Sequence, residues 1–470
     1  MRYLFLLLFT SLFLNAQTYE EYLRSQNEAF SSYKDAYDKE FSGFLNKEWK
    51  AYKASQGVES YEEEKPKTLP KVEKRAKVVI KKRILVQKKV EEPKKQKVFK
   101  KIIIQETTTS LKTMYMDYFG VSLALHYDRV DLLNGHSPLD EKSITQAWTS
   151  LAQSNYTQSI DELNHISKKL KLNDWAKYLL VKELASRVYK YDKQRNVFTW
   201  FVLLKMGYDT RIAYQNNKII LLLPVKGDLY STVYYQLDNK KYYALDYYAK
   251  GKLGSIKTYA HSYKGELKAI DFSLKTLPRF SPEVIDKNFR FRPFKKVEII
   301  ALQYDKHLLN FFQTYPQVSY KNYFSTVDAD VLKVSVQKSF NPLLMNKSES
   351  EALDVLLSFV QTSFKYKVDF EQFGKEKVMF SSETLFYPYS DCEDRAILFS
   401  YLVKTLLGMD VVGLQYKNHM ATAVKIKEKV KGEYVKVKNS KYIIADPTYI
   451  NANVGLSMPA YKGKKPYIIY

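Results

Sequence analysis

The sequence contains only one cysteine, Cys392, in 470 residues, so no disulfide can form within the chain. No run beyond the amino terminus approaches about eighteen uninterrupted apolar residues, so we expect no transmembrane segment in the mature protein. The five histidines other than His419 lack a cysteine or a second ligand at metal-binding spacing, which argues against a zinc site. The rest of the sequence therefore has to be interpreted around a single thiol.

The amino terminus has the pattern of a secretory signal peptide. Arg2 precedes an apolar run from Tyr3 to Leu14, and a small residue, Ala16, follows. This run is too short to span a bilayer. No cysteine stands at the expected cleavage position, which excludes a lipoprotein anchor. We expect residues 1–16 to be removed and the mature protein to be exported to the periplasm or the cell exterior, associated with the cell surface.

Export makes the lone thiol informative. Proteins in oxidising compartments usually carry cysteines in pairs, so an unpaired thiol is a liability there unless its chemistry is used. An inert buried cysteine is the alternative. The acidic residues beside Cys392 do not describe an apolar burial site, which favours a reactive thiol.

The net charge of +24 is concentrated in one segment. Lys65 to Lys101 contains sixteen Lys and Arg residues against three Glu, with prolines in or beside it. This composition predicts an extended, self-repelling linker over residues 56–101. Attachment to an anionic envelope surface is a second interpretation. We expect no nucleic-acid partner, because no aromatic residue interleaves with the charges before Phe99 and because export argues against it.

The remaining chain divides into four further parts of an α+β protein. Aromatic residues spaced by three and four predict an amphipathic helix within residues 17–55 that packs on a later domain or on a partner. A first domain is expected over 102–261 and a second over 346–470. Between them, alternating tracts over 262–345 predict a β-rich connecting module.

The two domains have the pattern of a duplication. Each contains a predicted helix that ends at a glycine, Gly207 or Gly408, with an aspartate two positions later. The tract Y-Q-N-N then matches Y-K-N-H, and Asp246 matches Asp446. The alternative interpretation is that the two domains are unrelated αβ units that share only a general pattern of helices and strands.

The first copy lacks the candidate catalytic residues of the second. Counting back from the paired glycines without gaps puts Tyr191 opposite Cys392, and the position of His419 is taken by Asn217. The first copy therefore has no thiol and no imidazole. We expect a catalytically dead repeat that is retained for packing or binding.

The second copy contains a set of residues suited to acyl transfer. Cys392 lies in Y-S-D-C-E-D-R-A at the start of a predicted apolar helix, His419 follows twenty-seven residues later, and Asp446 twenty-seven after that, each on its own predicted strand. A helix amino terminus and a contacting imidazolium both lower the pKa of a thiol. An aspartate can fix the imidazole tautomer. We predict Cys392 as nucleophile, His419 as base and Asp446 as orienting residue.

The residues around the cysteine have several possible roles. The negative charges of Asp391, Glu393 and Asp394 oppose a thiolate, and these acids could instead cap the helix or pair with Arg395. Asp391 and Glu393 are also candidate calcium ligands, although the chemistry requires no cofactor. The backbone N–H of Cys392 is one candidate oxyanion donor. Side-chain candidates from the preceding loop are Gln372, Tyr387 and Tyr389.

At these residues the chain resembles the transglutaminase-like superfamily, which has a papain-like core with a helix-borne cysteine. The D-C-E-D motif is similar to that of periplasmic bacterial transglutaminase-like cysteine proteinases, in which acids beside the cysteine are associated with calcium. The resemblance covers residues 350–460 and extends, in degenerate form, to 170–250. It implies the same roles for Cys392, His419 and Asp446. The second domain has no tryptophan, whereas tissue-type transglutaminases use one for the oxyanion, and this argues against protein crosslinking.

The sequence thus predicts an exported cysteine acyl-transfer enzyme. A peptidase or amidase that acts on a protein or peptide through a thioester on Cys392 fits best. The competing hypothesis is a non-catalytic, envelope-binding scaffold in which both copies supply the fold and the basic linker binds an anionic polymer.

Overall fold

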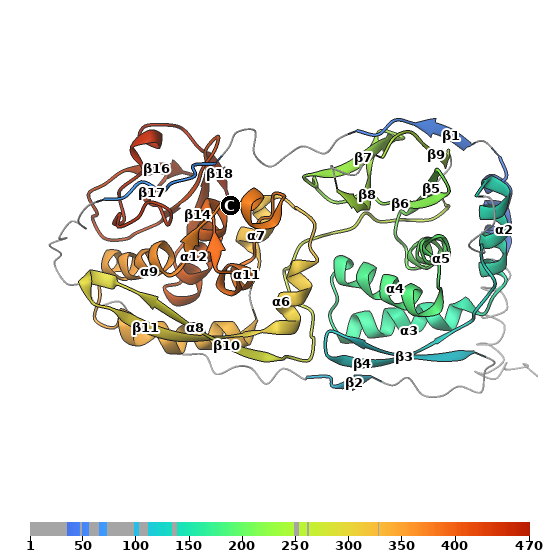
Figure 1. Cartoon of the computed structure of the whole chain (residues 1–470), viewed down its shortest axis with the longest axis horizontal. Helices are drawn as coiled ribbons and strands as arrows, with labels where there is room; N and C mark the ends of the chain where they lie inside the picture. Colours follow the sequence, from blue (N-terminus) through green and yellow to red (C-terminus); the bar gives the residue numbers. More distant parts are fainter. Residues whose placement is uncertain are drawn as a thin grey trace, which may run out of the picture.

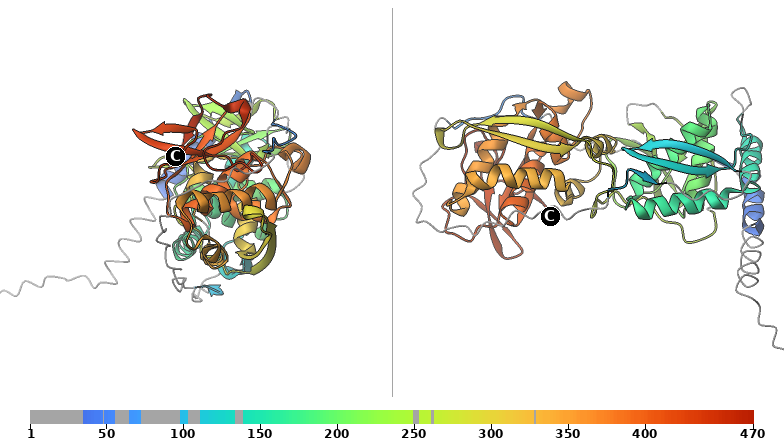
Figure 2. Two further views of the ribbon diagram at one scale, coloured as in Figure 1. Left: turned by 90° about the vertical axis from the view of Figure 1, so that its left-hand side faces the viewer. Right: turned by 90° about the horizontal axis from the view of Figure 1, so that it is seen from below.

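The computed structural model describes residues 35–47, 49–55, 65–72, 98–102, 111–133, 139–248, 253–260, 263–327 and 329–470. Within these ranges the chain forms two lobes that lie side by side, each combining helices with β-strands (Figures 1 and 2). The α+β class predicted from the sequence is confirmed. The predicted signal peptide lies outside the described residues, as does most of the lysine-rich segment.

The first lobe combines a hairpin, a group of helices and a sheet. Its elements are β1 (Trp49–Tyr52), β2 (Lys101–Ile102), β3 (Lys112–Tyr118), β4 (Val121–Tyr127), α2 (Glu141–Ala152), α3 (Tyr156–Lys169), α4 (Asp174–Val188), α5 (Asp192–Lys205), β5 (Arg211–Gln215), β6 (Lys218–Leu222), β7 (Thr232–Leu237), β8 (Lys240–Tyr248) and β9 (Ile256–Tyr259). The sheet has the order β1-β9-β5-β6, and a bridge between Leu223 and Tyr243 continues it to the β8–β7 pair.

The second lobe has a similar composition. Its elements are β10 (Val284–Phe291), η1 (Pro293–Lys295), β11 (Glu298–Asp305), α6 (Lys306–Gln313), α7 (Tyr320–Ser325), α8 (Asp330–Leu344), α9 (Glu349–Ser363), β12 (Lys365–Tyr366), α10 (Asp369–Phe373), α11 (Ser381–Phe386), β13 (Tyr389–Ser390), α12 (Cys392–Leu406), β14 (Val411–Gln415), β15 (Met420–Val424), β16 (Tyr434–Val437), β17 (Ser440–Ala445), η2 (Pro459–Tyr461) and β18 (Tyr467–Ile469). Its main sheet has the order β16-β17-β15-β14-β18.

The two lobes share the same strand order. With the bridge included, the first sheet runs β9-β5-β6-β8-β7 and the second runs β18-β14-β15-β17-β16. Helix α5 precedes β5 as α12 precedes β14, and a glycine with positive φ follows each helix, 83° at Gly207 and 64° at Gly408. Each lobe also has one long hairpin, β3–β4 or β10–β11, and both hairpins lie on the same side of the molecule (Figure 2). This correspondence supports a duplicated chain.

Helix α12 lies in the interior of the second lobe and fixes the position of Cys392. It packs against β14 and β15 and against α8, α9 and α11. Most of its side chains are buried, as expected for a helix that is covered on all sides. At its start, the Asp394 carboxylate accepts a hydrogen bond of 3.3 Å from the backbone N–H of Asp391.

Two predictions about the connecting parts are correct only in part. The predicted helix over 17–55 is helical at residues 35–45, but the chain then pairs as strand β1 with β9, because Trp49 and Tyr52 find partners on that sheet edge. The predicted β-rich module over 262–345 contains the β10–β11 hairpin but continues into α6, α7 and α8. Its buried apolar residues are divided between the core of the second lobe and the cluster that includes the first lobe, so these residues do not form a separate module.

Residues 65–72, here called the strap, lie on the second lobe, although β1 and β2 on either side of them in sequence belong to the first (Figure 1). The backbone N–H of Val72 donates to the Ile450 carbonyl at 3.0 Å, and the N–H of Ile450 donates to the Pro70 carbonyl at 3.2 Å. Lys65 is only 5% exposed. A self-repelling linker is therefore the wrong description of residues 65–72 within the basic segment.

A continuous apolar cluster joins the two lobes. Tyr315, which follows α6, contacts Trp175 of the first lobe and Phe380 of the second, with ring centroids 6.2 and 5.1 Å away. Asn173 donates a hydrogen bond of 2.7 Å to the Tyr315 hydroxyl. The same cluster extends to Cys392, so the packing around the thiol is continuous with the first lobe.

Candidate active site

Cys392 is the first residue of α12, as the sequence predicted, and its side chain is fully buried. The sulfur donates a hydrogen bond of 3.1 Å to Glu393 Oε2. Burial raises the pKa of the Cys392 thiol well above its ordinary value, and the charges of Glu393 and Asp391 raise it further, whereas Lys65 lowers it. This arrangement favours the protonated thiol over the thiolate.

His419 and Asp446 meet because their strands are paired. His419 directly precedes β15, Asp446 directly follows β17, and the two strands are antiparallel with Thr422 opposite Ala445. His419 Nε2 lies 2.9 Å from Asp446 Oδ2. The other carboxylate oxygen accepts the backbone N–H of Thr448 at 2.9 Å, which fixes the carboxylate in place.

The second nitrogen of His419 has no partner. Nδ1 is buried and forms no hydrogen bond among the described residues. The Tyr461 ring stacks on the imidazole with centroids 4.7 Å apart. The strand that begins after His419 packs against α12, so the imidazole and the thiol lie on neighbouring elements. The structure therefore joins His419 to Asp446 by a hydrogen bond but forms no such bond between His419 and Cys392.

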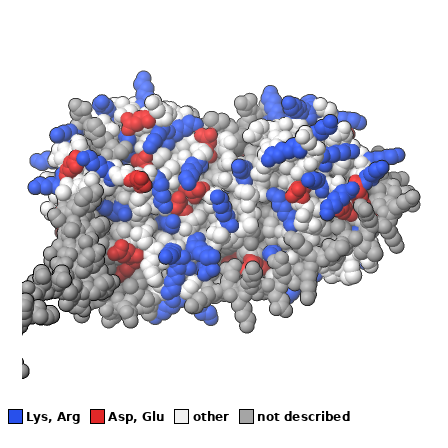
Figure 3. Space-filling model, turned by 180° about the vertical axis from the view of Figure 1, so that it is seen from behind, with Lys and Arg blue, Asp and Glu red and all other residues white. Residues whose placement is uncertain are grey.

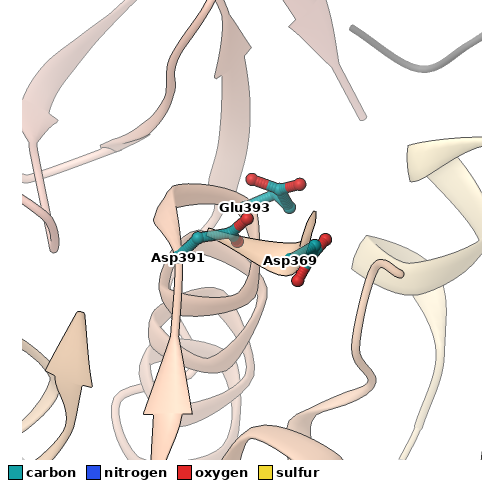
Figure 4. Close-up of side chains that lie close together, drawn as sticks. All are labelled: Asp369, Asp391 and Glu393. Atoms are coloured by element: carbon teal, nitrogen blue, oxygen red, sulfur yellow. The ribbon is translucent and has the colours of Figure 1, made fainter. Parts of the chain in front are cut away.

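Three carboxylates gather at the amino end of α12. Asp369, Asp391 and Glu393 each offer an oxygen within 4.8 Å of the others, and all three are buried (Figure 4). This set includes both predicted calcium ligands. Asp369, from α10, was missed because nothing in its local sequence marks it. Oxygen ligands of this kind suit calcium, so the donor set fits the metal that the resemblance implies.

The ammonium group of Lys65 lies among these carboxylates. Lys65 Nζ is 2.6 Å from Asp391 Oδ2, 2.9 Å from Glu376 Oε2 and 3.6 Å from Asp369 Oδ2, and it also donates to Glu393 Oε1. Burial would lower the pKa of Lys65, but Asp391 and Glu393 hold it well above its ordinary value. The four carboxylates outnumber the single ammonium.

The surplus of acids changes how they ionise. Burial, followed by the charge of Asp391, raises the pKa of Glu393 to about 8. Burial raises the pKa of Asp369 and of Asp394 well above the ordinary value. The cluster therefore retains protons near neutral pH, which reduces the repulsion between neighbouring carboxylates.

The contacts of the three predicted oxyanion donors do not connect them with the thiol. The Tyr387 hydroxyl accepts a hydrogen bond of 3.0 Å from Gln313. Lys367 lies over the Tyr389 ring, 5.3 Å from its centroid. Gln372 has a buried side-chain oxygen without a hydrogen-bond partner among the described residues. These contacts give no support for an oxyanion role.

Tyr366 was missed and is a better candidate. It lies on β12 directly opposite Ser390 on β13, two residues before the cysteine. Its hydroxyl is buried without a hydrogen-bond partner among the described residues. The guanidinium of Arg395 lies over its ring, 5.5 Å from the centroid. Burial raises the pKa of Tyr366 and the nearby thiol of Cys392 contributes, which indicates that the two side chains are neighbours.

The corresponding residues of the first lobe form ordinary surface contacts. Tyr191, at the start of α5, is 39% exposed. Asp246 accepts hydrogen bonds from Lys182 Nζ at 2.7 Å and from the Tyr178 hydroxyl at 3.2 Å. Asn217 accepts one of 3.1 Å from Lys193. None of these contacts involves a thiol or an imidazole.

Comparisons with protein-family models, curated proteins and solved structures found no significant match to the chain. Across the part of the chain that the structure describes, no helix is both long enough and apolar enough to cross a membrane. On the face shown in Figure 3, Lys and Arg side chains are spread over both lobes.

Proposed function

We propose that this chain is an exported, transglutaminase-like cysteine acyl-transfer enzyme, and that it acts as a peptidase or amidase on protein or peptide substrates. The observation that carries the proposal is the buried His419–Asp446 hydrogen bond. It leaves Nδ1 without a hydrogen-bond partner among the described residues, directly before the strand that packs against the helix of the only cysteine. The packing of α12, which begins at Cys392, against β14 and β15 supports the proposal.

The contact with Asp446 assigns the roles of the two imidazole nitrogens. A proton on Nε2 is donated to Asp446, so Nδ1 keeps the lone pair that can accept the proton of the Cys392 thiol. The imidazolium that forms is stabilised by the carboxylate. The amino terminus of α12 adds a positive field at the sulfur, and both effects favour the thiolate.

The reaction then proceeds through a thioester. The thiolate attacks the acyl carbon, the carbon–sulfur bond forms, and the leaving amine takes the proton from His419. Water, deprotonated by Nδ1, attacks the thioester and releases the carboxylic acid and the free thiol. The Cys392 backbone N–H and the Tyr366 hydroxyl are the donors that we propose for the oxyanion.

One observation favours the competing hypothesis of a non-catalytic, envelope-binding scaffold. Cys392 and His419 are both fully buried, and the thiol is bonded to Glu393 rather than to the imidazole. A scaffold would leave the thiol unreactive and would bind an anionic polymer through its basic side chains, with an affinity that falls as salt concentration rises.

An acylation experiment separates the two. p-Nitrophenyl acetate should transfer its acetyl group to Cys392, giving one added acetyl on the only thiol, followed by steady release of p-nitrophenol. The Cys392→Ala variant should lose at least about 100-fold in turnover, measured with and without calcium. Equal turnover by wild type and Cys392→Ala would eliminate the enzyme assignment.

A further inference from the structure

The strap brings a lysine to the cluster from a distant part of the sequence. Lys65 contacts Asp391 and Glu393 across more than 320 residues of chain. Glu393 accepts from Lys65 through Oε1 and from Cys392 through Oε2. The ammonium and the thiol thus donate to the two oxygens of one carboxylate, so the lysine lies near the sulfur.

The cluster has more ligand oxygens than the ammonium uses. The Oδ1 atoms of Asp369 and of Asp391 are buried and have no hydrogen-bond partner among the described residues. A buried carboxylate oxygen without a donor or a cation is costly. A divalent cation at this point would coordinate several carboxylate oxygens at about 2.3 to 2.6 Å and balance more of their charge than one ammonium does.

The two cations cannot bind together. Lys65 Nζ already lies 2.6 to 3.6 Å from the Asp391 and Asp369 oxygens that a metal ion would need. A metal ion on the same oxygens would be in contact with the ammonium, with strong repulsion in a buried site. Occupancy by one cation therefore requires the withdrawal of the other.

The strap is suited to withdrawal because, apart from one side chain, it is only shallowly buried. Lys65 is its one buried side chain, and the other strap residues are half-buried or exposed. Beyond the two backbone hydrogen bonds with Ile450, the Asn451 side chain donates to the Val72 carbonyl at 3.0 Å. These bonds lie at the end of the strap that is remote from Lys65.

We propose that the strap is a built-in plug of the candidate active site: the Lys65 ammonium and a divalent cation are alternative occupants of the Asp369–Asp391–Glu393 cluster, and withdrawal of Lys65 opens the space beside Cys392. The consequence for catalysis rests on the proposed function. The exchange of cations does not, and it can be measured without any turnover.

Calcium binding to the full chain tests the exchange. In isothermal titration of chelator-treated protein, Lys65→Met should bind calcium at least about tenfold more tightly than wild type, since it keeps the bulk of the side chain but removes the competing charge. The matched control is Lys71→Met, an exposed lysine of the same strap, which should behave as wild type. Equal affinities for wild type and Lys65→Met, or no binding by Lys65→Met, would overturn the exchange.

Access to the thiol tests the plug. Because Cys392 is the only cysteine, iodoacetamide labelling followed by mass spectrometry reports on it alone. Saturating calcium should raise the labelling rate of wild type at least about tenfold. Asn451→Gly, which removes a strap contact far from the cluster and suits the positive φ of 61° at this position, should raise the rate without calcium.

The labelling result does not depend on Lys65→Met being folded. A wild-type rate unchanged by calcium, together with an unchanged rate in Asn451→Gly, would overturn the plug. Failure of the proposed function is distinguishable: calcium exchange and faster labelling could both occur while Cys392→Ala retained full acyl-transfer activity.

Discussion

At the scale of single residues, the proposed mechanism depends most directly on the hydrogen bond between His419 and Asp446. In Asp446→Asn, the side-chain oxygen can still accept the backbone N–H groups of Thr448 and Tyr449, but the amide NH₂ cannot accept from His419 Nε2. The imidazole then loses its preferred tautomer. We expect acetyl transfer from p-nitrophenyl acetate to fall about 100-fold or more, with the unfolding temperature changed by only a few degrees. Unaltered turnover would remove Asp446 from the mechanism.

A second prediction at this scale concerns Tyr366. Tyr366→Phe removes one buried hydroxyl that has no hydrogen-bond partner among the described residues, so the folded state should lose little stability. If this hydroxyl donates to the oxyanion, turnover should fall about 10- to 1,000-fold with a smaller change in KM. Tyr389→Phe is the matched control, and an equal loss in both variants would argue against a specific role for Tyr366.

Only some residues of the candidate site could be predicted from the sequence. The order of Cys392, His419 and Asp446 led to the prediction that His419 and Asp446 would meet. They do so because His419 directly precedes β15, Asp446 directly follows β17, and these two strands pair. Lys65 and Tyr366 could not be assigned in this way. Their neighbours are set by chain segments that approach one another only in three dimensions, and a lysine-rich tract gives no sign that one of its lysines is buried.

At the scale of elements, the amino end of α12 should make stability depend on pH. Burial and Asp391 raise the pKa of Glu393 to about 8, above the ordinary value of 4.5 that it regains on unfolding. The folded state therefore holds this proton more tightly, and the free energy of unfolding should fall as pH rises from about 5 to about 8. Thermal unfolding with a chelator present would measure this.

Glu393→Gln provides the control for that pH dependence. Its unfolding temperature should vary less between pH 5 and pH 8, although some dependence should remain because Asp369 and Asp394 also have raised pKa values. The same slope in both proteins would assign the effect to other groups.

Elements with strong periodicity were predicted well, and those decided by tertiary pairing were not. The apolar pattern before Gly408 indicated a helix, and α12 occupies Cys392–Leu406. In contrast, the chain after Leu45 leaves the helix because Trp49 can pair with Tyr259 on a sheet edge. Local pattern gives no information on such a partner, which lies more than 200 residues away.

At the scale of the whole molecule, the paired glycines and aspartates predicted the repeat, and the common strand order agrees with it. The sequence did not predict how the lobes contact each other. That contact depends on aromatic residues that follow no repeat, such as Tyr315 between Trp175 and Phe380. With 40 tyrosines in the chain, no pattern singles this one out.

The apolar cluster that joins the two lobes predicts that they unfold together. All four tryptophans precede residue 201 and lie in or beside the first lobe, so their fluorescence reports on that lobe, whereas far-ultraviolet circular dichroism reports on both. In urea the two signals should have the same midpoint for wild type.

Tyr315→Ala should lower the free energy of unfolding by about 3 to 5 kcal/mol, because it removes ring contacts with both lobes and leaves Asn173 without its hydroxyl partner. Tyr434→Ala, at an exposed position on β16, should change the midpoint little. Separate midpoints in wild type, or equal effects of the two substitutions, would show that the lobes are stabilised independently.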